Sequence, residues 1–137
     1  MMKNNEGILF DKEVTRTYRD RYNVQCECDA CLLFYKEFET QYADLVIYLR
    51  KFGIEVDYPL AAMYFPDEED PYKHEYIVYY CVKGKLPADK MNDQIGSVHV
   101  TLRNWNVADE AYANTAMKAP YFIIELDQIM IHGHTLI

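Results

Sequence analysis

A run of apolar residues at helical spacing, between Cys26 and Gly53, constrains the fold of this chain more than any other feature. Its apolar side chains recur at steps of three and four residues, which places them on one face of an α-helix. They are Cys31, Phe34, Phe38, Tyr42, Leu45, Leu49 and Phe52. Asp29 precedes the stripe as the expected N-cap, and Gly53 is the left-handed residue expected to close the helix. We therefore predict one major helix within residues 29–53. A break near Thr40–Ala43 is left open, because polar residues interrupt good helix formers there.

Apolar and polar residues alternate on both sides of this helix, as they do in half-buried β-strands. Before the helix, the alternation runs from Val14 to Cys26 and places Cys26 on the inward face. After the helix, strands or extended pieces are predicted at residues 54–58, 60–65, 76–86, 98–103 and 121–131. The piece from Tyr76 to Leu86 is the strongest of these, because it is rich in Tyr, Val and Ile.

The connections between the strands carry proline, glycine and charge. Pro66–Pro71 is a predicted loop, because two prolines bracket four acidic residues. Residues 84–96 are predicted to form a turn or a wide hairpin loop, and the alanine-rich residues 108–118 a short helix. One helix followed by several strands with hairpin-length links indicates an α+β fold. We predict one major helix packed on a mainly antiparallel β-sheet, in a single domain that spans residues 1–137.

The composition excludes several classes of protein. The net charge is −8 and the pI is near 4.9, which opposes binding to nucleic acid, because a phosphate backbone requires a basic surface. No apolar run approaches the roughly 20 residues that span a membrane. No N-terminal apolar segment with a cleavage site is present, so we expect a cytoplasmic protein with reduced or metal-bound cysteines.

Three cysteines, Cys26, Cys28 and Cys31, fall within six residues at the expected start of the helix. Close spacing lowers the entropic cost of gathering thiolates around zinc, which takes four ligands in a tetrahedral shell. The fourth ligand must come from elsewhere, and His134 is the first candidate, followed by Cys81. The alternative is a set of buried thiols without metal, because free cysteine often fills protein cores. Under both hypotheses, strand parity and helix phase bring the three thiols into one small volume on the side that faces the core.

Other chemistries receive less support. Cys28 and Cys31 have the spacing of a redox pair at a helix start, where the helix dipole lowers a thiol pKa. The neighbouring Glu27 and Asp29 oppose this effect, because negative charge disfavours a thiolate. The acidic run at residues 67–70 lacks the glycine and the oxygen spacing of a calcium loop. The sequence contains no glycine-rich phosphate loop and no nucleophile motif, so we expect no enzymatic activity.

Several short motifs are spread over most of the chain. A C-x-C-x-x-C-x-x-F run opens at Cys26, and a Gly-Ile-Glu turn at Gly53 is followed by Pro59. A tyrosine-rich strand ends in Val-Lys-Gly-Lys at residues 82–85, and a late strand with a Pro-x-hydrophobic-x-x-Glu pattern begins at Pro120. In this combination the chain resembles a group of small uncharacterised bacterial proteins. It departs from them at its C-terminus, where Ile-His-Gly-His at residues 131–134 takes the place of a Pro-Trp pair. The resemblance implies no known activity.

The first functional hypothesis is a non-catalytic domain that acts by binding another protein. Its basis is the negative charge, the thirteen tyrosines and the lack of a catalytic set of residues. Aromatic anchors with an acidic rim suit a basic partner, as in an inhibitor or an immunity-type protein. The alternative is a small zinc-binding module, in which Cys26, Cys28, Cys31 and His134 form a structural site. A thiol redox protein is the third hypothesis.

Overall fold

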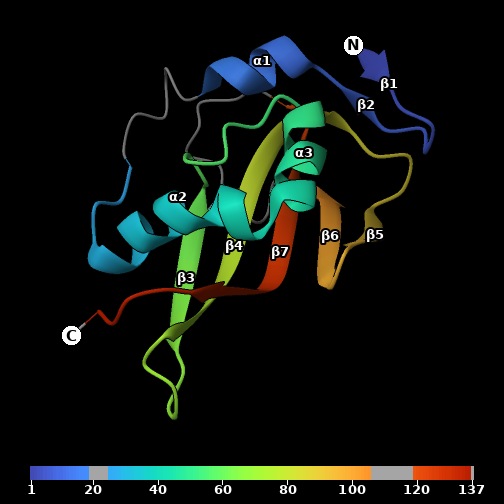
Figure 1. Cartoon of the computed structure of the whole chain (residues 1–137). Coiled ribbons are helices and arrows are strands. Elements are labelled where there is room, and N and C mark those ends of the chain that lie inside the picture. The colour runs from blue at the N-terminus through green and yellow to red at the C-terminus, as the bar shows by residue number, and fades with distance from the viewer. Residues whose placement is uncertain (19–24, 106–118, 137) are drawn as a thin grey trace.

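The structure, a computed structural model, describes residues 1–18, 25–105 and 119–136, and this part of the chain is mixed helix and strand (Figure 1). The helices are α1 (Lys12–Thr17), α2 (Asp29–Gln41) and α3 (Ala43–Lys51). The strands are β1 (Met2–Lys3), β2 (Leu9–Phe10), β3 (Ala61–Pro66), β4 (Lys73–Lys85), β5 (Lys90–Ile95), β6 (Val98–Asn104) and β7 (Tyr121–His132). None of the helices within these ranges is long and apolar enough to cross a lipid bilayer.

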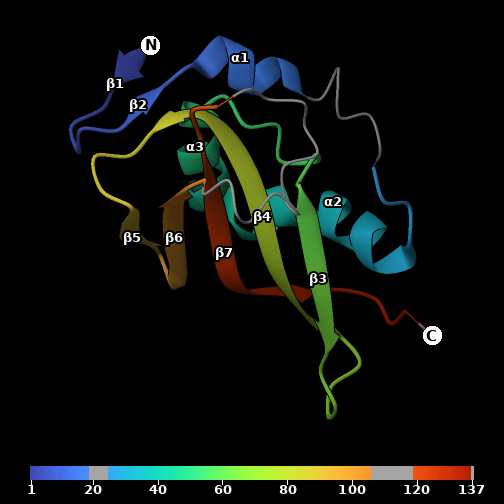
Figure 2. The same cartoon turned by 180° about the vertical axis from the view of Figure 1, so that it is seen from behind.

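The strands form one curled antiparallel sheet in the order β1-β2-β4-β7-β6-β5, and β3 pairs with β4 beside this path. The two longest strands, β4 and β7, pair at the centre, from Lys73↔His132 to Lys83↔Tyr121. Seen from behind the helices, β3 forms one edge of the sheet and β5 the other (Figure 2). The predicted antiparallel sheet is therefore confirmed.

The central strands are buried on both faces. On one face, Tyr76, Val78, Tyr80 and Val82 of β4 belong to the main core, which α2 and α3 cover (Figure 1). On the opposite face, the alternate residues Tyr79 and Cys81 belong to a second, smaller cluster. It also contains Tyr18, Leu60, Tyr121 and Ile123. Burial on both faces explains why β4 reads as an almost continuous run of apolar and aromatic residues.

The predicted stripe is buried on the helical side of the sheet. Phe34, Phe38, Leu45, Leu49 and Phe52 are all at most 4 % exposed, so the predicted helical phase is confirmed. Gly53 follows with φ +91°, and a Cβ at this position would collide with the backbone of Lys12. Only glycine fits such a close approach in the left-handed region.

The helical region is divided at Tyr42, which has φ −132° and ψ 51°, inside the range where a break was left open. Hydrogen bonds to β7 explain the division. The Gln41 side chain donates to the carbonyl of His132 (2.7 Å) and accepts from its N–H (2.9 Å). The Tyr42 hydroxyl makes the same two bonds with Met130 (3.0 and 2.8 Å). Since β6 pairs with β7 only as far as Leu126, these side chains satisfy backbone groups that lack a β6 partner.

The fold class is therefore α+β with an antiparallel sheet, as predicted, but it does not contain one clear major helix. The helical residues after Cys28 form two helices, and α1 adds a third at the end of the sheet (Figure 1). At the division, Gln41 and Tyr42 form long-range hydrogen bonds with β7. A local sequence pattern cannot specify a partner about 90 residues away, so the division could not be predicted with certainty from the helical stripe.

The predicted strand from Val14 to Cys26 is wrong over its described part. Residues 12–17 form α1, capped by the Asp11 carboxylate, which accepts from the Val14 N–H at 3.0 Å. Val14 and Tyr18 fit a period of two but also lie four residues apart, which is a helical spacing. Residues 19–24 lie outside the described ranges.

Three other local predictions have different outcomes. Residues 54–58 are not a strand, although Ile54 and Val56 are buried in the main core. The expected loop at residues 84–96 contains β5, which forms a hairpin with β6 through a two-residue turn at Gly96-Ser97. Gly96 has φ +61° there, as the favoured hairpin turns require. The polar sequence of β5 concealed it, because its residues are half-buried or exposed. The predicted helix at residues 108–118 lies outside the described part of the chain.

Candidate metal centre

The sulfur atoms of Cys26, Cys28 and Cys31 lie within 4.8 Å of one another. The Sγ atoms of Cys26 and Cys28 are 3.3 Å apart, and no cysteine forms a disulfide. Tetrahedral zinc with Zn–S bonds of about 2.3 Å holds its sulfur ligands about 3.8 Å apart. Small side-chain rotations therefore suffice to bring three thiolates to one ion, and the prediction that the thiols share a small volume is confirmed.

The start of α2 positions these thiols. Cys28 is the N-cap residue, with φ −66° and ψ 159°, and its sulfur accepts from the Cys31 N–H at 3.4 Å. The predicted N-cap, Asp29, is instead the first residue of the helix. The thiol has taken the place of the usual oxygen acceptor, so the local sequence places the cluster at a helix N-terminus.

Exposure differs among the three cysteines. Cys31 is buried, whereas Cys26 and Cys28 are exposed. The prediction that Cys26 and Cys28 face the core is wrong. Residues 25–28 do not form a strand, so period-two parity does not apply to Cys26. Cys28 is the N-cap residue, which precedes α2, so the helical phase that buries Cys31 does not extend to it. Two of the three sulfurs are accessible to an ion from solvent.

The environment has opposite effects on two of the thiols. The Cys31 N–H, followed by the thiol of Cys26, lowers the pKa of Cys28 below its ordinary value. Burial, followed by the hydrogen bonds to Cys26 and Cys28, raises the pKa of Cys31 to about 12. Without metal, Cys28 therefore loses its proton more readily than an ordinary cysteine, whereas Cys31 is a neutral thiol whose proton an incoming cation must displace.

A pocket of about 250 Å³ lies beside the cluster, at the junction between the start of α2 and the start of β3. Its lining residues are Gln25, Cys26, Cys31, Tyr35, Tyr58, Pro59, Leu60, Ala61 and Ala62. The Tyr35 hydroxyl donates to the Cys26 carbonyl (2.9 Å), and the Gln25 amide donates to the Asp57 carbonyl (2.6 Å). These two bonds hold the cysteine segment against α2 and the loop that precedes β3.

Tyr35 was missed in the sequence, although it lies one helical turn after Cys31 and so falls on the same side of the helix. Its role depends on a hydroxyl contact with residue 26, nine positions away. The loop residues 57–60 and the first two residues of β3 gave no sequence signal of this contact, because their proximity to the cysteines arises only from the tertiary fold.

The two candidates for a fourth ligand lie elsewhere. Cys81 is fully buried in the second cluster, on the face of the sheet opposite α2 and α3. The backbone carbonyl of His134 is hydrogen-bonded to Nε2 of His74 at 2.9 Å. Among the described residues, the group of mutually close ligands comprises only the three cysteines. Ligation by His134 stays a prediction.

The acidic run at residues 67–70 forms a turn between β3 and β4, as predicted for a loop. The Asp67 carboxylate accepts from the N–H groups of Glu69 (2.9 Å) and Asp70 (2.8 Å). These contacts assign Asp67 to turn formation.

Comparisons of this chain with protein-family models, with curated proteins and with solved structures found no match.

Proposed function

We propose that this protein binds a zinc ion through Cys26, Cys28 and Cys31. The single observation that supports the proposal is the gathering of three sulfur atoms within 4.8 Å of one another. Thiolates select soft or borderline metals such as Zn²⁺ and Cu⁺ over the hard ions Mg²⁺ and Ca²⁺. Zinc is the expected occupant, because it combines thiolate affinity with an absence of redox chemistry.

The proposed role of the ion is structural. Cys26 precedes α2, Cys28 caps it and Cys31 lies in its first turn, so one ion would join the incoming segment to the helix. Metal binding would then contribute to the free energy of folding, as it does in other small zinc modules. The fourth coordination position would be taken by water or by a residue from elsewhere, with His134 as the predicted protein ligand.

Metal analysis of protein purified without a histidine tag tests this proposal. We expect one zinc per chain in the native protein and little metal in Cys28→Ala. Cys81→Ala is the matched control, because it removes the one cysteine outside the cluster and should keep the metal. Cobalt substitution adds a second measurement, since thiolate-to-cobalt absorption reports sulfur ligation directly. Protein that takes up neither zinc nor cobalt, with all four thiols free to titrate, contradicts the proposal.

Binding of a basic protein partner, the first hypothesis from the sequence, stays a prediction. The net charge of −8 supports it, because opposite charge speeds the encounter of two proteins and favours partners of the opposite sign.

A further inference from the structure

Strand β3 is an edge strand of the sheet with no described strand on its outer side. It pairs with β4 from Ala61↔Tyr79 to Pro66↔His74, and both views show it at the border of the sheet (Figures 1 and 2). Such an edge carries N–H and C=O groups that point outward and are available to a further strand. The β3–β4 hairpin also projects beyond the rest of the sheet (Figure 2), so its lower part is open to a large partner.

Other edges of the same sheet are protected against pairing. β5 carries Lys90 and Asp93, and charged side chains discourage the addition of a strand. The outer side of β7 near Met130 and His132 is closed by hydrogen bonds from Gln41 and Tyr42. β3 has the sequence Ala-Ala-Met-Tyr-Phe-Pro, without a charged residue. Among these edges, β3 alone lacks a protective charge or a covering side chain in the described part of the chain.

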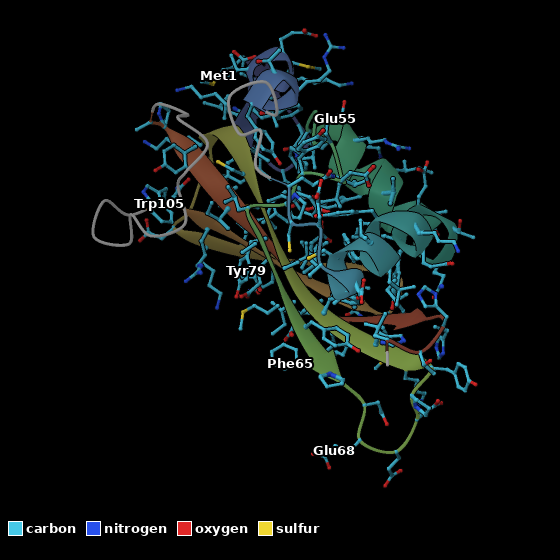
Figure 3. All side chains as sticks on the ribbon, turned by 90° about the vertical axis from the view of Figure 1, so that its left-hand side faces the viewer. Met1, Glu55, Phe65, Glu68, Tyr79 and Trp105 are labelled. Carbon is cyan, nitrogen blue, oxygen red and sulfur yellow. The ribbon has the colours of Figure 1, made fainter. Side chains whose placement is uncertain are left out.

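β3 also exposes apolar side chains on one face. Met63 is 46 % exposed and Phe65 is 39 % exposed, and strand alternation places them on the same face of the sheet. Figure 3 shows Phe65 on the side of Tyr79 and Trp105, away from the helices. The half-buried Ile77 of β4 pairs with Met63 on this face. An added strand would therefore find an apolar surface next to free backbone groups.

The charge around β3 identifies the kind of strand that fits. Residues 55–75 carry seven carboxylates, whereas Lys73 is their only lysine or arginine. Four of the carboxylates, at residues 67–70, lie in the turn at the end of β3, and Figure 3 shows Glu68 at its tip. A second copy of this chain, paired antiparallel through β3, would bring its own acidic turn toward Glu55 and Asp57. Like charges repel, so a basic strand fits better than a second copy.

We propose that β3 is the docking edge for an extended, basic segment of another protein, which adds to the sheet as an antiparallel strand. Antiparallel pairing places the N-terminal end of that segment opposite Pro66, so its lysine or arginine residues belong at this end, beside residues 67–70. Its apolar side chains then alternate along the face of Met63 and Phe65. Main-chain bonds supply affinity in this mode, and side-chain contacts and charge supply specificity.

A synthetic peptide of this pattern provides the probe. The test peptide is acetyl-Lys-Lys-Thr-Val-Thr-Val-Thr-Val-amide, and binding to the full chain is followed by fluorescence anisotropy of a labelled copy. A second peptide carries both lysines at the carboxyl end, and a third replaces both lysines by glutamate. We expect the first peptide to bind most tightly and to weaken several-fold between about 50 and 300 mM salt, because exposed charges are screened. Amide hydrogen exchange at residues 61–66 should slow when it binds.

Two matched variants locate the binding edge. Met63→Lys adds a charge to an exposed position of β3 and should weaken binding at least about tenfold, since edge charges oppose strand pairing. Gln94→Lys adds the same charge to an exposed position of the opposite edge strand, β5, and should leave binding within about twofold. Circular dichroism and thermal melting should show that both variants keep the fold.

Four results overturn the proposal. The first is equal affinity for the three peptides, which removes the role of charge and of strand direction. The second is unchanged binding by Met63→Lys, and the third is binding without slower exchange at residues 61–66. Self-association of the chain that Met63→Lys abolishes also overturns it, because a second copy would then be the occupant of this edge. Zinc content is measured on the same samples, so failure of the metal proposal is recorded separately.

Discussion

The apparent zinc affinity of this protein is expected to rise steeply with pH. Burial, followed by hydrogen bonding to Cys26 and Cys28, raises the pKa of Cys31 to about 12, so this thiol carries its proton throughout the neutral range. A cysteine that ligates zinc is a thiolate, and binding therefore releases the Cys31 proton to solvent. Each proton released changes the apparent affinity tenfold per pH unit, or by about 1.4 kcal/mol. From pH 6.5 to 7.5 we expect zinc to bind at least about tenfold more tightly.

Competition with a chromophoric zinc chelator measures this slope, with the pH dependence of the chelator calibrated separately. Titrations at pH 6.5, 7.0 and 7.5 and constant ionic strength are sufficient. Cys81→Ala should reproduce the native slope, because Cys81 is not part of the thiol cluster. Cys31→Ala should bind zinc weakly and lose about one proton from the slope. A zinc affinity that stays flat across this range would refute the reasoning, because it would mean that no thiol proton is displaced.

Three further outcomes are expected. In the metal-free protein, the free energy of unfolding should fall as the pH rises, whereas zinc affinity increases with pH. The pKa of Cys31 is raised above its ordinary 9.0. The contribution of Cys31 to stability is therefore complete below about pH 9 and is lost toward pH 12. Denaturation of chelated native protein and of Cys31→Ala should converge over that range. Leu49→Ala should lower the free energy of unfolding by about 2–5 kcal/mol in urea titrations, because Leu49 is fully buried; a cost below about 1 kcal/mol would contradict the packing. Tyr42→Phe should cost about 1–3 kcal/mol, because it removes both hydrogen bonds to Met130. Tyr48→Phe is its control, since no hydrogen bond of the Tyr48 hydroxyl is found among the described residues; equal losses would argue against a role for Tyr42.

The helical stripe could be predicted because its information is local. Helical spacing identified which side chains between Phe34 and Phe52 are buried, and Gly53 marked where the helices end. The same kind of pattern gave a wrong prediction over the described part of Val14 to Cys26, because a few residues can match a helical and a strand period at once. Asp11, three residues before Val14, was the local signal that would have decided in favour of a helix.

The division between α2 and α3 depends on distant residues. The polar residues near Thr40–Ala43 indicated where a break could occur. The break itself is explained by the hydrogen bonds that Gln41 and Tyr42 make with the backbone of His132 and Met130. β5 is a strand where the sequence predicted a loop. Its residues have little apolar pattern of their own, and pairing with β6 gives them the strand conformation. Edge strands receive their conformation largely from a neighbour, so sequence alone describes them poorly.

The thiol cluster was also predictable only in part. Close spacing in sequence was enough to expect that Cys26, Cys28 and Cys31 meet. The predicted burial of Cys26 rested on a strand that the described residues 14–18 and 25–26 do not form, and Cys26 is exposed. Residues 58–62 also line the pocket beside the cysteines. The sequence near the cysteines does not predict that contact. A local motif can indicate which residues are ligands, but the environment of those ligands is determined by the tertiary fold.

The candidate metal centre and the proposed docking edge share one short segment of the chain. Ala61 and Ala62 line the pocket beside the cysteines and are also the first residues of β3. A substitution at either position would disturb both sites and would identify neither. Met63 is the first residue of β3 outside the pocket lining, and its side chain is exposed. Cys28, in turn, lies outside the pocket lining and is not part of β3. Substitutions at Met63 and Cys28 therefore separate docking from metal binding, since each changes one site and leaves the residues of the other in place.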